Sequence, residues 1–294
     1  MKKINKEVSF KKDKKRKLYN TTAGNAVIFC FLVLLSAFMI LPMFYAILQS
    51  FKPMEEIFAY PPKFFVKNPT FNNYLQAIKL ADNLYIPFSR YLVNSAIVSI
   101  IGTTVYVLIA VMSGYALAKG KFPGNKLISS LVVWTMLFTG SITAIPQYVV
   151  ISKLGLVDNH LSIILPAFAE TMGIFLMKQF ILSDIPDEIL EAARIDGSGE
   201  FKIITNIVFP NIKPACATLI IFTFQGLWNN AGSTYIYTES KKMLPTVLSS
   251  ISSGGLARAG ATAAVAVILM VPPIAMFLYS QRSVTETMSH SGLK

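Results

Sequence analysis

Long apolar runs are the feature that most restricts how this chain can fold. The run from Ala26 to Leu48 contains no charged residue, and neither does the run from Tyr91 to Ala118. A helix needs about 20 apolar residues to cross a bilayer, and both runs are longer than that. The 294-residue chain is 53% hydrophobic and 14% charged, with a mean hydropathy of +0.54. Such a chain cannot bury its apolar surface in a soluble core, so we predict an all-α membrane protein.

Six transmembrane helices are expected from the apolar runs. Their approximate bounds are Ala26 to Leu48 with a kink at Pro42, Tyr91 to Ala118, Leu127 to Pro146, Leu161 to Ile181, a fifth helix beginning after Pro214, and Ala261 to Ser280 with an interruption at Pro272 and Pro273. In the second helix, Ser95, Ser99 and Thr103 recur every four residues. A face of small residues predicts packing against other helices instead of lipid.

Basic residues predict the orientation of these helices. Nine of the 27 Lys and Arg residues lie within the first 17 positions, and positively charged segments stay on the cytoplasmic side. With both termini inside, 18 basic residues face the cytoplasm and nine face outward, so cytoplasmic N- and C-termini are expected. The net charge of +12 therefore reflects topology, and no nucleic acid is expected as a partner. The expected organisation is a basic tail (1–22), a first helix with an extracytoplasmic loop (23–87), a five-helix core (88–282) containing a cytoplasmic loop (184–214), and a C-terminal tail (283–294).

That polar loop, from Asp184 to Pro214, is predicted to fold as two short helices joined by a turn. Asp184 is a candidate N-cap for the first helix, and Gly197 supplies the left-handed residue that ends it. The second helix has Phe201, Ile204 and Val208 as its apolar positions and is expected to be ended by Pro210 and Pro214. Neither helix can cross a bilayer, and each has an apolar face that needs a partner, as in an element that docks into another protein.

This segment resembles the cytoplasmic coupling loop of permeases from ATP-binding cassette (ABC) importers. The resemblance lies in the order Glu191, Ala192, Ala193, three residues, Gly197, nine residues, Ile207, one residue, Phe209 and Pro210, in which Phe209 replaces a family leucine. It implies the type I importer (MetI-like) permease fold and a loop that docks into a groove on an ATPase. By that resemblance the ATPase-coupling residues are Glu188, Glu191, Ala192, Ala193, Arg194, Asp196 and Gly197. The alternative for Glu191 is a helical ion pair with Arg194, worth only about 0.3 kcal/mol on an exposed surface.

Three further stretches resemble the second permease subunit of maltose-type carbohydrate importers. They are Ser50-Phe51-Lys52, Leu244-Pro245-Thr246 and the ending Ser291-Gly292-Leu293-Lys294. The resemblance implies a sugar substrate, a homologous second permease subunit, a dimer of ABC ATPases, an extracytoplasmic solute-binding protein and a multi-pass position among the lipids of the cell membrane. It also implies alternating access driven by ATP. Two alternatives stay open: an importer of another solute, such as glycerol phosphate or an amino acid, and a membrane enzyme or scaffold that transports nothing.

The sequence lacks the residue patterns that enzymes use. No stretch has the spacing of a P-loop, so ATP hydrolysis is expected to reside in a separate subunit. His160 and His290 fall at opposite membrane faces, and no Cys/His cluster has metal-ligand spacing, so neither a metal nor a cofactor is expected. We therefore expect a transport subunit that is not itself an enzyme.

Polar residues in or near the membrane are the candidates for contact with substrate. Amide and indole groups after the fifth helix suit hydrogen bonding and stacking on sugars, and Glu170 is the one acid or base expected at depth. The candidates are Asn94, Glu170, Gln225, Trp228, Asn229 and Asn230. Two alternatives are that Glu170 binds a neighbouring helix and that Trp228 belongs to an interfacial aromatic belt.

Overall fold

The computed structural model describes residues 22–82, 86–138 and 140–291, and the regular structure within these ranges is entirely helical. The chain forms two compact units, residues 1–45 and 46–294. In the first unit the described part is the long apolar helix α1 (Thr22–Phe51), which contains Pro42 and continues into the second unit for its last six residues. The predicted basic tail falls almost wholly outside the described residues.

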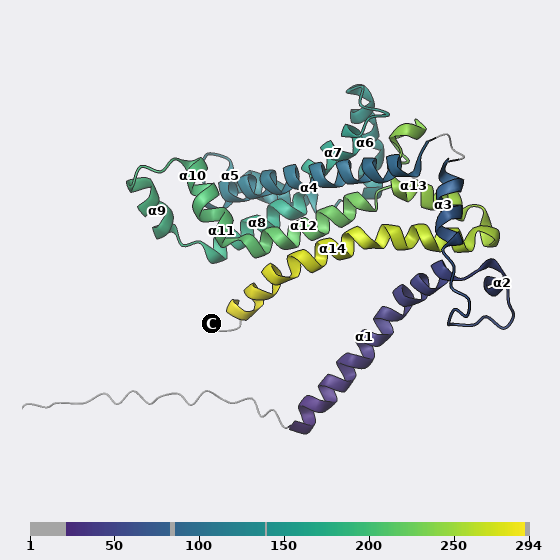
Figure 1. Cartoon of the computed structure of the whole chain (residues 1–294). Helices are drawn as coiled ribbons and strands as arrows, with labels where there is room; N and C mark the ends of the chain where they lie inside the picture. Colours follow the sequence, from purple (N-terminus) through teal and green to yellow (C-terminus); the bar gives the residue numbers. More distant parts are fainter. Residues whose placement is uncertain (1–21, 83–85, 139, 292–294) are drawn as a thin grey trace, which may run out of the picture. The chain divides into compact units, whose positions relative to one another are not determined.

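A bundle of long helices forms the centre of the second unit (Figure 1). Helix α4 (Phe88–Lys119) packs along α8 (Thr171–Asp184) and α12 (Lys213–Trp228), and α12 packs along α14 (Ala259–Ser291). The small-residue face of α4 is buried: Ser95 and Ser99 are fully covered and Thr103 is 5% exposed. The prediction that this face packs against helices is confirmed.

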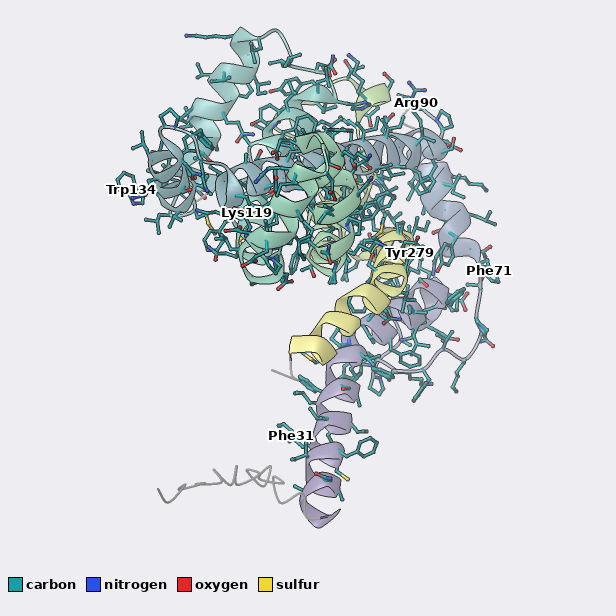
Figure 2. All side chains as sticks on the ribbon, turned by 90° about the vertical axis from the view of Figure 1, so that its left-hand side faces the viewer. Phe31, Phe71, Arg90, Lys119, Trp134 and Tyr279 are labelled. Carbon is teal, nitrogen blue, oxygen red and sulfur yellow. The ribbon has the colours of Figure 1, made fainter. Side chains whose placement is uncertain are left out.

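Four helices in the described ranges are long and apolar enough to cross a membrane, and two bent helix pairs raise the number to six if each pair is one span. The first pair is α5 (Asn125–Thr135) and α6 (Gly140–Lys153), which are bent by 112°. The helix expected from Leu127 to Pro146 is therefore broken after Thr135, and Pro146 lies inside α6. On α5, Trp134 is 60% exposed and projects away from the ribbon (Figure 2).

The fourth apolar run also has a break, and a tyrosine fills it. Helix α7 (Leu161–Phe168) ends just before Glu170, and α8 begins just after it. Tyr106 of α4 donates its hydroxyl to the Glu170 carbonyl at 2.6 Å and accepts the Gly173 backbone N–H at 3.0 Å. Backbone groups left open by a helix break need such partners inside a membrane, so Tyr106 stabilises the break and fixes where Glu170 lies.

The last helix, α14, runs unbroken through Pro272 and Pro273, so the predicted interruption is wrong. Pro273 has no N–H to give to the carbonyl of Leu269, four residues earlier. The indole Nε1 of Trp228 donates to that carbonyl at 2.9 Å instead. Because a neighbouring helix satisfies the freed acceptor, the helix continues past its proline pair.

Shorter elements connect the long helices of the second unit. They are α2 (Met54–Ile57), α3 (Asn72–Asp82), η2 (Glu239–Lys241), α13 (Leu244–Ser252) and η3 (Gly255–Arg258). Asn73 of α3 donates to the carbonyls of Ser50 and Lys52 at 2.9 and 2.7 Å, so α3 caps the end of α1 within this unit. Between α1 and α4 the described part of the chain therefore forms a connecting segment with two short helices, α2 and α3.

Candidate functional site

The segment resembling a coupling loop begins with α9 (Asp187–Ile195). Asp184 is not its N-cap, contrary to prediction, because α8 includes Asp184 and the chain then extends through Ile185 and Pro186. A proline disfavours helical geometry in the residue before it, so Pro186 separates the two helices. The left-handed stop is confirmed, since Gly197 has φ of 80° and the following N–H of Ser198 bonds to the Ala193 carbonyl at 2.9 Å.

The second helix of the segment ends at Asn211, between Pro210 and Pro214, the two prolines predicted to end it. It runs through α10 (Glu200–Ile203), the π-helical turn η1 (Ile204–Val208) and α11 (Phe209–Asn211). Pro210 does not end it, because it lies in the first turn of α11, where a missing N–H costs little. The helix then meets α12 at 83°.

The apolar side chains of the segment divide into two groups. Leu190, Ile203 and Val208 are at most 1% exposed and join the core formed with α4 and α8. Ile195 and Phe201 are 86% and 71% exposed, so both remain available to a partner. Exposed apolar side chains on a segment held to a rigid core are typical of a surface that a partner covers.

Two polar contacts fix the segment to the end of α4. Lys119 donates to the Asp187 carboxylate at 2.6 Å and to the Ile185 carbonyl at 2.7 Å. The hydrogen bond from Lys119 lowers the pKa of Asp187 below its usual range. These bonds tie the start of α9 to the membrane helix that carries Lys119.

Tyr115, one turn earlier on α4, makes the second contact. It donates its hydroxyl to the Glu200 carboxylate at 2.6 Å, and Arg194 pairs with the same carboxylate at 2.8 Å. Arg194 also donates to the Tyr115 hydroxyl at 3.1 Å. Tyr115 of α4 therefore bonds both the end of α9, through Arg194, and the start of α10, through Glu200.

Glu191 is left exposed by this arrangement. Arg194 bonds Glu200, so the alternative Glu191–Arg194 pair is not formed, and the Glu191 carboxylate has no bonding partner among the described residues. The other members of the predicted coupling set lie on the same short segment. Glu188, Ala192, Asp196 and Gly197 are exposed, and Ala193 is half-buried.

Two of the predicted pathway residues lie in the packed interior. Trp228 is 3% exposed, stacks on Phe224 and has its N–H bonded to Leu269, so neither ring face nor indole donor is free for a sugar. It is likewise no member of an interfacial belt. Asn94 is 3% exposed and donates to the carbonyls of Ser240 and Lys242, both at 2.9 Å. We correct both assignments: these side chains hold helices and loops together.

The remaining candidates lie nearer the surface. Gln225 and Asn229 are exposed, and neither lines the pocket that contains Glu170 and Asn230. Glu170 and Asn230 come together in a pocket of about 210 Å³ between α6, α7 and α12. The structure thus unites two of the six predicted pathway residues.

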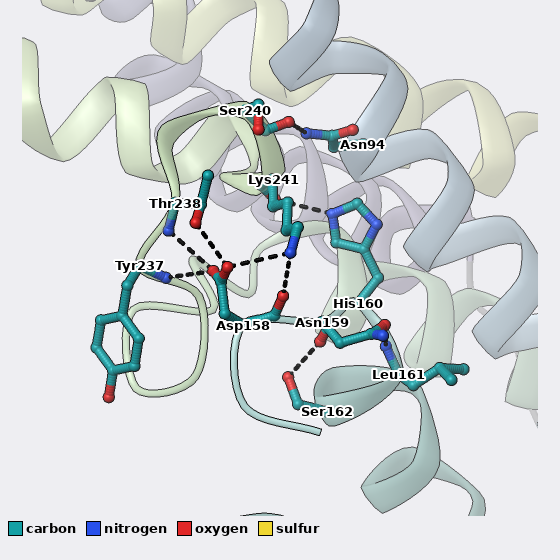
Figure 3. Close-up of polar contacts among 10 residues, drawn as sticks. All are labelled: Asn94, Asp158, Asn159, His160, Leu161, Ser162, Tyr237, Thr238, Ser240 and Lys241. Atoms are coloured by element: carbon teal, nitrogen blue, oxygen red, sulfur yellow. Dashed lines mark hydrogen bonds and ion pairs between the residues drawn. The ribbon is translucent and has the colours of Figure 1, made fainter. Parts of the chain in front are cut away.

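A polar network that the sequence did not predict joins two connecting loops at the other end of α4 (Figure 3). Asp158 accepts bonds from the backbone N–H groups of Tyr237 and Thr238 at 3.0 and 2.8 Å, from the Thr238 hydroxyl at 2.6 Å and from Lys241 at 3.1 Å. These bonds, the Thr238 hydroxyl foremost, hold the pKa of Asp158 well below its usual range. His160 bonds the Lys241 carbonyl at 2.8 Å. The polar triplet Asp158, Asn159 and His160 just before an apolar run was the available sequence signal.

Comparisons with known proteins agree with this architecture. The relative YtcP of Bacillus subtilis (strain 168), a polygalacturonan/rhamnogalacturonan transport system permease protein, is 31% identical over 74% of this chain and 74% of its own. UgpE of Yersinia enterocolitica, an sn-glycerol-3-phosphate transport system permease protein, is 32% identical over 67% of this chain and 71% of its own. A crystal structure of a bacterial ABC transporter involved in alginate import shares the fold, with a TM-score of 0.74 at 22% identity, covering 90% of this chain and 98% of that one.

The fold defines a polytopic helical membrane protein. Residues 25–287 match the family of binding-protein-dependent transport system inner membrane components, and the chain belongs to that family. It is a multi-pass protein of the cell membrane.

Proposed function

We propose that this chain is one of two permease subunits of an ABC importer for a sugar or oligosaccharide. It forms half of the translocation pathway beside a homologous second permease, receives substrate from a solute-binding protein and is driven by a dimer of ATPase subunits. ATP hydrolysis belongs to those subunits. In the proposed topology α5 and α6 together form one span and α12 forms the fifth span, giving six spans with both termini and residues 184–214 in the cytoplasm.

The domain bounds expected from the sequence complete this proposal. The proposed protein has four parts: a tail (1–22), the first helix with its loop (23–87), the permease core (88–282) and a second tail (283–294). The excess of basic residues on the cytoplasmic side supports the topology.

One observation supports the coupling role: α9 is bonded to α4 on one face, while its opposite face is exposed. Lys119 and Tyr115 bond the segment to α4, so a displacement of α9 moves a membrane helix with it. Glu191 has no bonding partner within the described chain and lies exposed, ready for a basic residue on an ATPase. A docked helix transmits the difference in binding free energy between two states of the motor.

The sugar assignment rests on the relatives and on pocket chemistry. YtcP is named for polygalacturonan and rhamnogalacturonan, and the structural neighbour imports alginate. The second candidate is an sn-glycerol-3-phosphate importer, favoured by the 32% identity to UgpE. A phosphorylated substrate calls for convergent Arg or Lys side chains, and none of the residues lining the pocket of Glu170 is basic.

Reconstitution of the whole importer in liposomes tests the proposal. The complex contains this chain, its second permease, the ATPase dimer and the binding protein, and uptake of labelled oligosaccharides is compared with that of sn-glycerol 3-phosphate. Saccharide uptake that requires ATP and the binding protein is the expected result. Uptake of glycerol phosphate alone, or transport by this subunit unaided, would overturn the assignment.

A further inference from the structure

The pocket between α6, α7 and α12 has polar groups with no partner of their own. Thr223 is only 5% exposed, lines the pocket, and its hydroxyl forms no hydrogen bond within the described residues. The Glu170 carboxyl group and the Gln147 amide also line it without a bonding partner in the described chain. These three groups line the pocket with unused hydrogen-bonding capacity, so they are available to a ligand that enters it.

Asn230 and Tyr235 complete the polar side of the pocket. The Asn230 side-chain oxygen accepts the Gly232 N–H at 2.8 Å, which fixes the amide and leaves its NH₂ group free to donate. The Tyr235 ring stacks on Tyr148, with centroids 6.0 Å apart and planes at 16°. A supported aromatic ring beside amide and hydroxyl groups suits the alternating C–H and O–H surface of a sugar.

The described lining of the pocket contains an acidic side chain and no basic one. Among the described residues that line it, Glu170 has the only carboxyl group, and none is Lys, Arg or His. A carboxyl group accepts bonds from sugar hydroxyls but offers no positive charge to a uronate or a phosphate. An anionic ligand would meet a like charge when Glu170 is ionised, and no basic side chain in the pocket lining would offset its loss of hydration.

We propose that this pocket binds one ring of an uncharged sugar during passage, with Glu170 selecting neutral saccharides over acidic ones. The volume of about 210 Å³ is on the scale of a single hexose ring. This assignment rests on the proposed importer function and adds the substrate class. It differs from the acidic glycan named for the structural neighbour and from the phosphate ester named for UgpE.

Tyr106 is the positioning residue for this selection. It bonds the backbone on both sides of the helix break that carries Glu170, at the Glu170 carbonyl and at the Gly173 N–H. A Cβ at position 173 would lie 2.3 Å from the Tyr106 hydroxyl, so glycine is required for this contact. The acid therefore projects from a fixed break and not from a mobile loop.

The test uses the reconstituted importer with matched pairs of labelled disaccharides, galactose with galacturonate and glucose with glucuronate. Wild type is expected to take up the neutral member at least about tenfold faster than its acidic counterpart. E170Q should raise the half-saturating concentration of the neutral sugar about fivefold or more, and E170K should shift the preference toward the acidic member. Glu55→Gln, the same change on exposed α2, is the matched control.

The outcomes separate this proposal from the importer function. Preferred uptake of the acidic sugars by wild type, or E170Q kinetics equal to those of E55Q, overturns the pocket assignment while leaving a saccharide importer. Absence of uptake for every saccharide overturns the proposed function itself. If E170Q does not co-purify with its partners, Thr223→Val removes the free hydroxyl without a charge change and must weaken neutral sugar uptake for the proposal to stand.

Discussion

The two ends of α4 are completed in different ways. Near Asn94, the connecting loops bond to one another through Asp158 and Lys241. Near Lys119, the segment of α9 is anchored but leaves Glu191 and the apolar Ile195 exposed. Polar groups that are bonded within the chain stabilise the subunit, whereas exposed groups without a partner are available to bind another protein. Substitutions at the first end should therefore change stability, and those at the second should change coupling.

The largest expected effect is at the open end. Glu191→Lys should lower ATP-driven uptake at least about tenfold, because a like-charge contact with a basic residue on the ATPase costs several kcal/mol. The thermal midpoint of the purified subunit should stay unchanged, since Glu191 is exposed and unbonded within the described chain. Glu55→Lys on α2 is the control for charge reversal. Normal uptake by E191K would break the distinction between the two ends.

The next effect is on the stability of the subunit, when a buried bond between α12 and α14 is removed. Trp228→Phe keeps an aromatic ring but leaves the Leu269 carbonyl without its donor, and an unsatisfied buried acceptor costs about 1–3 kcal/mol. Thermal unfolding in detergent should show a lower midpoint. Trp134→Phe is the matched control, because Trp134 is 60% exposed. Equal midpoints for the two variants would mean that the indole bond does not support the proline pair of α14.

A smaller effect is expected when an anchor of α9 is removed. Lys119→Met deletes the bonds to Asp187 and to the Ile185 carbonyl. Asp187 is largely exposed, so the pair contributes only about 0–1 kcal/mol to stability. Transport should respond more strongly, with sugar moved per ATP hydrolysed falling about two- to fivefold, by loss of rigid positioning. Lys121→Met serves as the control, and an unchanged transport ratio in K119M would remove Lys119 from the coupling path.

The smallest expected effect is a pH dependence of stability that arises from Asp158. The pKa of Asp158 is lowered by its hydrogen bonds, so its stabilising contribution is present above the unfolded carboxyl pKa of about 3.9 and is lost as pH falls through the lower folded value. Wild-type stability should therefore drop more than that of Asp158→Asn between about pH 5 and about pH 3. Parallel pH profiles in thermal unfolding would show that the loop network does not depend on this carboxylate.

Much of the fold followed from local patterns. The four-residue spacing of Ser95, Ser99 and Thr103 correctly predicted the buried face of α4, because helical periodicity alone decides which side chains share a face. The stop at Gly197 was predicted for a similar reason, since a left-handed residue is a local requirement.

The errors arose where distant residues act. Pro272 and Pro273 do not interrupt α14 because Trp228, on another helix, supplies the missing donor. The same bond removes Trp228 from the pathway candidates. Asp158 was missed because its partners lie about 80 residues away along the chain, and no local spacing connects them. Helix breaks and polar networks of this kind depend on tertiary contacts that a single sequence does not display.

The most direct test of the central claim is a crosslink from α9. Cys30 and Cys216 are both free and are first replaced; a single cysteine then stands at the exposed position 192 (Ala192→Cys) and, in a control chain, at position 55 (Glu55→Cys). A photoactivatable group on each cysteine is irradiated in membranes that contain the whole importer. The account predicts an adduct between position 192 and the ATPase subunit and none from position 55. Absence of the adduct from position 192, or equal adducts from both positions, would contradict the claim that α9 is the segment on which the motor acts.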